Sequence, residues 1–333
     1  MWVWAWLLAC GVESTEPVAE IEAPVAQQTV TVYSGRSESM VGDLFARAEK
    51  ELGLTIDVQY GGTPELTTRL LTEGDASPAD IFFAQDSGHL GALASTGRLS
   101  SLDASLLESV SDTFRDPKGL WLGTSGRLRV LVYDPARTPA ESMPTSLRDL
   151  ADPAWKGRLG WAPGNGSFQA HVSYLRAAWG EEETRTWLKG VKANAPKVFP
   201  KNSPQVAAVN DGALEIGWVN HYYLHRVDPN GRKAANWSFP DAADAGNVMM
   251  VAGMGRLSHS DAVEASNTLM AWFVSQPVQE VFAQTNKEYP ARAGVATHAD
   301  VTPLDTVDLA EVDQASLTDL GPTRAMLKEL ELL

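Results

Sequence analysis

Cysteine is almost absent from this sequence, whose 333 residues contain a single one, Cys10. The chain beyond residue 10 therefore has neither a disulfide bridge nor a thiolate nucleophile. Two hydrolase motifs are missing as well, the Gly-x-Ser-x-Gly elbow and the zinc-binding His-Glu-x-x-His helix. The six histidines are scattered, and most are expected to be surface or core residues. These absences argue against a secreted hydrolase, the alternative from another class, and favour a protein that is not an enzyme.

Basic residues are also scarce. The chain has 27 Lys and Arg against 42 Asp and Glu, a net charge of -15, and no basic run. This balance excludes nucleic acid and anionic lipid surfaces as partners, because both are recognised through clustered positive charge. The hydrophobic content of 44% and the charged content of 21% are typical of a soluble globular protein, and the length suits two domains.

The apolar run at the N-terminus is too short to cross a membrane. It covers residues 1–10, whereas a membrane-spanning helix needs about 20 apolar residues. The run resembles the hydrophobic part of a signal peptide, and residues 7–10 (Leu-Leu-Ala-Cys) resemble the bacterial lipobox, whose cysteine is lipidated. We expect residues 1–10 to be a signal peptide with a lipidation site at Cys10. Residues 11–28, rich in Glu, Pro and Ala, are expected to be a flexible tether.

Strand and helix patterns alternate after this tether. Strands are expected at residues 29–33, 54–60, 78–83, 127–134, 157–162, 214–219 and 246–253. Helices are expected at residues 41–52, 65–72, 145–150, 168–179, 200–210, 261–275, 277–284 and 321–332, with another ending at 187–191. This order predicts α/β architecture with largely parallel sheets. The polar turns at residues 35–38 and 85–87 would lie on one edge of the first sheet, which predicts a cleft there.

A tyrosine-rich segment follows the strand expected at residues 214–219. Tyr222 and Tyr223 are adjacent, with Asn220 and His221 before them and His225 after them. Side chains that follow a strand are presented at its end, where α/β proteins keep their ligand sites. The pair is therefore a site candidate. The alternative is two aromatic residues at the start of a helix, one facing the core and one with its hydroxyl in water.

A glycine-containing turn precedes the helix expected at residues 168–179. The turn includes Asn165, Gly166 and Ser167. A helix N-terminus can bind an anion, because its first N–H groups lack partners within the helix. Many such turns only cap a helix, and both interpretations stay open on the residues alone.

Seven segments taken together resemble bacterial periplasmic ferric-ion-binding proteins, the substrate-binding components of iron ABC transporters. They are residues 32–35, 77–83, 125–130, 153–158, 201–203, 220–223 and 288–290. The resemblance implies a two-lobe clamshell in which each lobe is a mixed, mostly parallel sheet flanked by helices, with two crossover strands between the lobes. The first lobe would comprise residues 29–130 and 248–298, and the second residues 131–247 and 299–333. A monomeric periplasmic protein would capture Fe(III) between the lobes and deliver it to an inner-membrane ABC permease.

The resemblance also implies which residues form the site. Tyr222 and Tyr223 fall on the family's tyrosinate pair, in agreement with the preference of Fe(III) for anionic oxygen. A tyrosine with an ordinary pKa of about 10 must lose its proton to bind, and the metal drives that loss. Residues matched to the binding of a synergistic carbonate or phosphate, or to ordering of the site, are Arg127, Asn165, Gly166, Ser167, Asn202, Asn220 and Tyr289.

Three positions depart from the family pattern. Ser37 stands where many members have a histidine ligand, Gln85 where they have a glutamate ligand, and Trp161 where some have a third tyrosine. Either the tyrosine pair holds iron with a synergistic anion and water, or Glu38 or Asp86 supplies the missing ligand, or the ligand is an organic or phosphorus-containing anion without metal. We favour the first, because Arg36 and Arg127 could balance a bound carbonate or phosphate.

Overall fold

The computed structural model describes residue 1 and residues 28–227, 231–312, 316–317 and 320–333. The predicted lipidation site Cys10 and nearly all of the predicted signal peptide and tether lie outside these residues. None of the helices in the described part is long and apolar enough to cross a membrane.

Strands and helices alternate through the described residues. The strands are β1 (Thr29–Ser34), β2 (Thr55–Tyr60), β3 (Ile81–Ala84), β4 (Leu122–Tyr133), β5 (Leu159–Trp161), β6 (Lys197–Val198), β7 (Ile216–Asn220), β8 (Ala235–Trp237), β9 (Met249–Arg256) and β10 (Tyr289–Pro290). The helices are α1 (Glu38–Leu52), α2 (Thr63–Glu73), α3 (Ser87–Ser95), α4 (Ala104–Glu108), α5 (Gly166–Trp179), α6 (Glu181–Ala193), α7 (Asn202–Asn210), α8 (Val263–Phe273), α9 (Gln276–Gln284) and α10 (Leu320–Glu329).

The strands follow the order β2-β1-β3-β9-β4-β7-β5-β6, with β8 and β10 paired to β4. The outer strands pair in parallel, β1 with β2 and β3, and β5 with β6 and β7. The pairs made by β4 and the pair of β3 with β9 are antiparallel. We call the half built on β1, β2 and β3 the first lobe, and the half built on β5, β6 and β7 the second lobe. The predicted α/β architecture with mixed sheets is confirmed.

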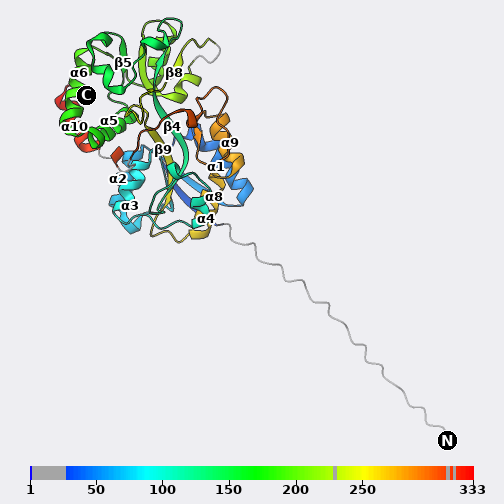
Figure 1. The fold of residues 1–333 in the computed structure, drawn as a ribbon. Helices are drawn as coiled ribbons and strands as arrows, with labels where there is room; N and C mark the ends of the chain where they lie inside the picture. Colours follow the sequence, from blue (N-terminus) through cyan, green and yellow to red (C-terminus); the bar gives the residue numbers. More distant parts are fainter. Residues whose placement is uncertain (2–27, 228–230, 313–315, 318–319) are drawn as a thin grey trace.

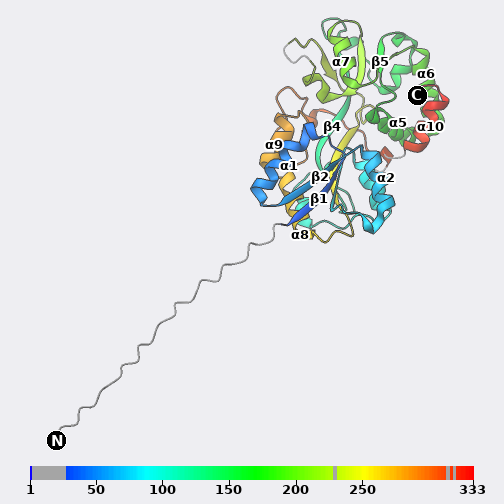
Figure 2. The ribbon, with the colours of Figure 1, turned by 180° about the vertical axis from the view of Figure 1, so that it is seen from behind.

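Strand β4 belongs to both lobes. Its residues from Leu122 to Leu128 pair with β9, and those from Arg129 to Tyr133 pair with β7. Figure 1 shows β4 and β9 running between the two halves of the molecule. Helices α1, α8 and α9 lie on one side of the first-lobe strands and α2 and α3 on the other, as the opposite view in Figure 2 also shows. The pairing of β4 changes from one lobe to the other at Leu128 and Arg129.

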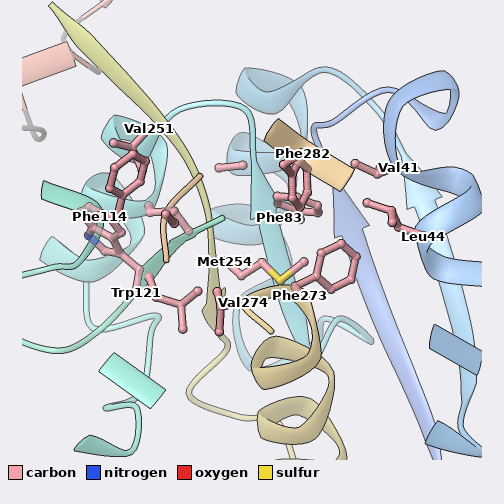
Figure 3. Packing of buried hydrophobic residues seen from close by; sticks show 14 of the residues in the cluster. Val41, Leu44, Phe83, Phe114, Trp121, Val251, Met254, Phe273, Val274 and Phe282 are labelled. Atoms are coloured by element: carbon pink, nitrogen blue, oxygen red, sulfur yellow. The ribbon is translucent and has the colours of Figure 1, made fainter. Parts of the chain in front are cut away.

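Two clusters of buried apolar residues form the interior. The first surrounds Phe45, Phe83 and Phe273, whose ring centroids lie 5.0 to 6.3 Å apart. Figure 3 shows Phe83 and Phe273 within this cluster. The second surrounds Trp218, which packs edge to face with Phe168 at 5.0 Å. Burying one such side chain stabilises the fold by roughly 1.5 to 3 kcal/mol. Helix α10 joins the second cluster through Met326 and Leu327.

Several elements differ from their prediction. Strand β4 begins at Leu122 rather than at residue 127, and the helix expected at residues 145–150 is the 3₁₀ turn Leu147–Ala151. Helices α3 and α4 were not predicted. The periodicity of α3 is weak because Ser87, Gly88, His89 and Leu90 are all buried, so no polar face marks it. The predicted residue boundaries of the lobes stay a prediction.

Candidate functional site

The tyrosine pair lies directly after β7. Strand pairing with β4 ends at Asn220, and a 3₁₀ turn, His221–His225, follows. The rings of Tyr222 and Tyr223 lie side by side, with centroids 4.5 Å apart and planes at 31°. Tyr222 is 3% exposed, whereas Tyr223 is half-buried. The end of β7 therefore presents two phenol groups next to each other.

Both tyrosines line a cavity of about 250 Å³ to which the two lobes contribute. From the first lobe the lining residues are Gly35, Thr63, Pro64, Gln85, Asp86 and His89. Arg127 of β4, together with Asn165, Gly166, Ser167, Ala170, Tyr222, Tyr223 and Leu320, completes the lining. The cavity thus brings together the predicted tyrosine pair, the predicted turn before α5, Arg127, Gln85 and Asp86.

The phenol of Tyr222 keeps its proton near neutral pH. Burial raises the pKa of Tyr222, and a charge on Tyr223 raises it further, whereas the charge of Arg127 lowers it. The net direction is upward from the ordinary value of about 10. Loss of this proton therefore requires a cation that binds the phenolate oxygen more strongly than the proton does.

Arg127 places a positive charge in the cavity wall. Its side chain is 2% exposed, and it donates from Nη1 to the backbone oxygen of Gln85. Its Nε atom has no hydrogen-bond partner among the described residues. Burial lowers the pKa of Arg127, and the negative charge of Asp86 acts in the opposite direction. A buried guanidinium with an unused donor suits an anion in the cavity.

The N-terminus of α5 forms part of the second-lobe wall. Asn165 caps this helix, and its Oδ1 accepts a hydrogen bond from the backbone N–H of Ser167 at 3.0 Å. Asn220 is buried behind it and links two elements: its Nδ2 donates to Ser167 Oγ at 3.2 Å, and its Oδ1 accepts from Nη1 of Arg129 at 3.0 Å. This chain of hydrogen bonds fixes the helix N-terminus against the strand that leads to the tyrosines.

The structure does not bring Arg36 to the cavity. Arg36 is fully buried, and its Nη2 lies 2.7 Å from Oε2 of Glu288 in a salt bridge. Its Nη1 also donates to Oε1 of Gln85 at 3.4 Å. The positive charge of Arg36 is therefore balanced within the protein, and it is not available to a bound anion in the way that the sequence analysis expected.

Four other predicted residues also lie away from the cavity. Ser37 and Glu38 are exposed at the start of α1. Asn202 is 1% exposed, and its side-chain nitrogen and oxygen have no partner among the described residues. Tyr289 donates from its hydroxyl to the backbone oxygen of Thr302 at 2.9 Å. Tyr289 does not line the cavity but packs against His221, which precedes the tyrosine pair. The centroids of the Tyr289 and His221 rings lie 4.7 Å apart.

His221 holds the tyrosine turn in place. Its Nδ1 accepts a hydrogen bond from the backbone N–H of Leu128 at 3.0 Å, and its Nε2 lies 2.8 Å from the backbone oxygen of Lys287. The accepting Nδ1 fixes the tautomer in which Nε2–H donates. Burial lowers the pKa of His221 to about 4, so the ring is neutral. Its bonds fasten the segment that carries the tyrosines to β4 and to the residues just before β10.

Sequence reasoning missed two polar groups of the first-lobe wall. Oγ1 of Thr63, at the start of α2, accepts from the backbone N–H of Gln85 at 3.1 Å. A Cβ on Gly35 would approach this oxygen to 2.0 Å, so the loop after β1 fits only glycine. His89 lies in the first turn of α3, and its Nδ1 is 2.6 Å from Oδ1 of Asp86. The sequence does carry one signal for this pair: Asp86 can cap a helix, and His89 follows three residues later, on the same side of the first turn.

Asp86 is ionised in this setting. Burial raises its pKa, but the charge and hydrogen bonds of His89 and the charge of Arg127 outweigh burial and lower it. In the part of the chain that the structure describes, no group of three or more His, Cys, Asp or Glu side chains could hold a metal ion. A metal site in this cavity would therefore depend on the phenol oxygens.

Comparisons with known proteins identify the family of the chain. The family model of bacterial extracellular solute-binding proteins matches residues 76–313. The Fe(3+)-binding periplasmic protein of Serratia marcescens is 32% identical over 301 residues, which are 89% of this chain and 88% of that protein.

Solved structures show the same fold. Iron-bound HitA from Pseudomonas aeruginosa is 28% identical, with a TM-score of 0.81 over 91% of this chain and 99% of that one. Trichodesmium IdiA (FutA), in complex with iron and citrate, is 25% identical, with a TM-score of 0.79 over 92% of this chain and 100% of that one.

These findings confirm the resemblance on which the fold was predicted. The family model covers more than half of the chain, and the Serratia relative is similar over most of its length. The relatives are iron-binding transport proteins, so the prediction that the chain is not an enzyme is confirmed as well. The chain belongs to the family of bacterial extracellular solute-binding proteins.

Proposed function

We propose that this protein captures Fe(III) in the cavity between its lobes and passes it to an ABC permease. One observation carries the proposal: Tyr222 and Tyr223 lie side by side in a cavity that also holds Arg127 and the N-terminus of α5. Phenolate oxygen is a donor that suits a hard trivalent cation. The names of the Serratia relative and of iron-bound HitA point to the same cargo.

The charges of the cavity favour a synergistic anion beside the iron. Two phenolates leave one positive charge of Fe(III) unbalanced, and an anion would complete both the charge and the coordination. Arg127 and the N–H groups at the start of α5 are the donors for carbonate or phosphate. Arg36 is not part of this anion site in our proposal, because Glu288 already balances its charge.

The lipobox-like residues 7–10 support membrane anchoring as part of this proposal, and the family of solute-binding proteins supports delivery to a permease. Lipidation at Cys10 would hold a periplasmic monomer at the inner membrane, close to the permease. Closure of the two lobes about β4 and β9 would enclose the ion, as in other hinged binding proteins. The periplasmic assignment is supported by the name of the Serratia relative.

Titration of metal-stripped protein with ferric citrate tests the proposal. We expect a visible phenolate-to-iron charge-transfer band in the red to purple region for the wild-type protein. Tyr222→Phe and Tyr223→Phe should each abolish the band or severely weaken binding. Tyr60→Phe is the matched control, because Tyr60 lies on β2 outside the cavity. A wild-type protein without the band, or an unchanged Tyr222→Phe variant, would sink the iron assignment.

A second candidate function is the binding of an organic or phosphorus-containing anion without metal. The unused Nε of buried Arg127 beside a helix N-terminus favours it. Calorimetry of metal-free protein with inorganic phosphate separates the two functions. Tight binding that is unchanged in Tyr222→Phe would support the anion carrier, whereas binding only in the presence of Fe(III) would support the iron carrier.

A further inference from the structure

We propose that His89 is the ligand that the first lobe gives to Fe(III), and that Asp86 orients it. This inference rests on the proposed function. It supplies a first-lobe iron ligand in place of the histidine and glutamate that many relatives have and this chain lacks. Ser37, which replaces the expected histidine after β1, is exposed and outside the cavity. His89 lines the cavity from α3, in a wall that faces the same space as the tyrosine pair.

The Asp86 carboxylate fixes the imidazole of His89. Oδ1 of Asp86 accepts a hydrogen bond from the backbone N–H of residue 89 at 3.3 Å and lies 2.6 Å from Nδ1 of the ring. Asp86 is also the N-cap of α3, so the helix holds the carboxylate in place. A histidine whose one nitrogen donates to a carboxylate is the arrangement that orients imidazole ligands in metal sites.

The second ring nitrogen is the one left for a metal. An ionised carboxylate can only accept hydrogen bonds, so Nδ1 of His89 is the donor to Asp86, and Nε2 is the ring nitrogen whose lone pair a metal could take. Among the described residues, Nε2 of His89 has no hydrogen-bond partner, whereas the ring of His221 uses both nitrogens. Imidazole nitrogen is a suitable ligand for iron. Coordination through Nε2 would leave the bond to Asp86 intact.

Several other polar groups of this wall already make hydrogen bonds. The backbone N–H of Gln85 bonds to Thr63, its backbone oxygen accepts from Arg127, and its side-chain oxygen accepts from Arg36. Oδ1 of Asp86 is used by His89. His89 therefore offers the cargo an uncommitted nitrogen lone pair from the first lobe when the lobes close.

The protons balance without a redox step. Iron enters as Fe(III) and stays Fe(III), two phenols each release a proton to solvent, and Nε2 of His89 donates its lone pair. A ring that is doubly protonated before binding releases one more proton.

Pulsed electron paramagnetic resonance tests the assignment. Protein loaded with ferric citrate in a nitrogen-free buffer should show hyperfine coupling from an imidazole nitrogen, and its pattern should change when histidine is labelled with ¹⁵N. His89→Gln should lose the coupling while keeping the charge-transfer band, with Fe(III) affinity lower by about tenfold or more. Asp86→Asn should keep the coupling and weaken affinity by about 10 to 100-fold.

The controls separate this inference from the proposed function. His259→Gln should change nothing, because His259 contacts Ser77 and does not line the cavity. Circular dichroism should show that His89→Gln is folded. A wild-type protein with the charge-transfer band but the same nitrogen coupling as His89→Gln would overturn the role of His89 alone. A wild-type protein without the band would overturn the proposed function and this inference with it.

Discussion

Arg36 and Glu288 form a buried ion pair between segments 252 residues apart in sequence. Nη2 of Arg36 lies 2.7 Å from Oε2 and 3.0 Å from Oε1 of Glu288, and the side chains are 0% and 1% exposed. The pair ties the loop after β1 to the segment before β10. The pair stabilises the fold. Its link to the cavity is the hydrogen bond from Arg36 to the side chain of Gln85, which lines the cavity.

Glu288→Gln should therefore destabilise the protein. The variant leaves the guanidinium of Arg36 buried without its counter-charge, and breaking a buried pair in this way costs about 3 to 5 kcal/mol. Urea unfolding measures the change in the free energy of unfolding. Glu38→Gln removes an exposed carboxylate and should stay within about 0.5 kcal/mol of the wild type. Equal stability of the two variants would show that Arg36 does not depend on Glu288.

Arg127→Gln should weaken Fe(III) binding in carbonate or phosphate buffer by about 10 to 100-fold. The substitution removes a charge-assisted hydrogen bond to the anion, worth about 1.5 to 3 kcal/mol. Competition with a chelator measures the affinity. Gln85→Ala is the control and should matter little, because Gln85 contacts Thr63 and Arg127 through its backbone, and its side chain accepts only the long 3.4 Å bond from Arg36. A strong loss of Fe(III) affinity in Gln85→Ala alone would show that the first lobe contributes to binding through the side chain of Gln85.

Iron binding should release protons. Tyr222 is a neutral phenol before binding, because burial raises its pKa, and both tyrosines bind as phenolates in the proposed site. Each Fe(III) should therefore release about two protons, and the affinity should rise with pH. Titration in a weakly buffered solution with a pH electrode counts them. Iron uptake at constant pH without proton release would contradict binding through the tyrosine pair.

Acid should destabilise the protein between about pH 6.5 and pH 4. Burial lowers the pKa of His221 to about 4 in the folded protein, whereas an unfolded histidine titrates near 6.5. In this range the unfolded chain binds more protons, so stability rises with pH and is lost on acidification, by about 3 kcal/mol for this residue. The buried His171, with its pKa lowered to about 3 by burial and by the charge of Arg129, acts in the same direction.

One substitution separates the contribution of His221 to the acid sensitivity from that of other groups. His221→Gln should lower the free energy of unfolding at pH 7, since it loses the bonds to Leu128 and Lys287. Its stability should then fall less steeply on acidification than that of the wild type. Chemical unfolding curves at several pH values provide the comparison. An unchanged slope would show that another group dominates the acid sensitivity.

The parts of the site that could be predicted have local signals. Tyr222 and Tyr223 are adjacent and follow a strand, and the turn at residues 165–167 opens a helix. Both features can be recognised within a few residues, and the resemblance to iron-binding proteins placed them in one cleft. The α/β order could be predicted in the same way, because alternating strands and helices show distinct periodicities.

The parts that could not be predicted depend on contacts between residues far apart in sequence, or lie on a helix without an amphipathic pattern. Nothing near Arg36 in the sequence indicates Glu288 as its partner, so the arginine looked available to an anion. His89 belongs to α3, whose small and mostly buried residues show no amphipathic pattern. Pairing of β10 with β4 turns the Tyr289 ring toward His221 and its hydroxyl to Thr302, a result of tertiary packing.

If the molecule opens by rotation of its lobes, the bond from Leu128 of β4 to His221 would hold the tyrosine wall of the cavity in place. Leu128 lies where β4 stops pairing with β9 and starts pairing with β7, so a rotation of one lobe against the other would be centred near this residue. The tyrosines lie beside this point and would move little, whereas α3 would move with the first lobe. Opening would therefore withdraw His89 before it disturbs the phenolates, and the cargo would leave last from the tyrosine side.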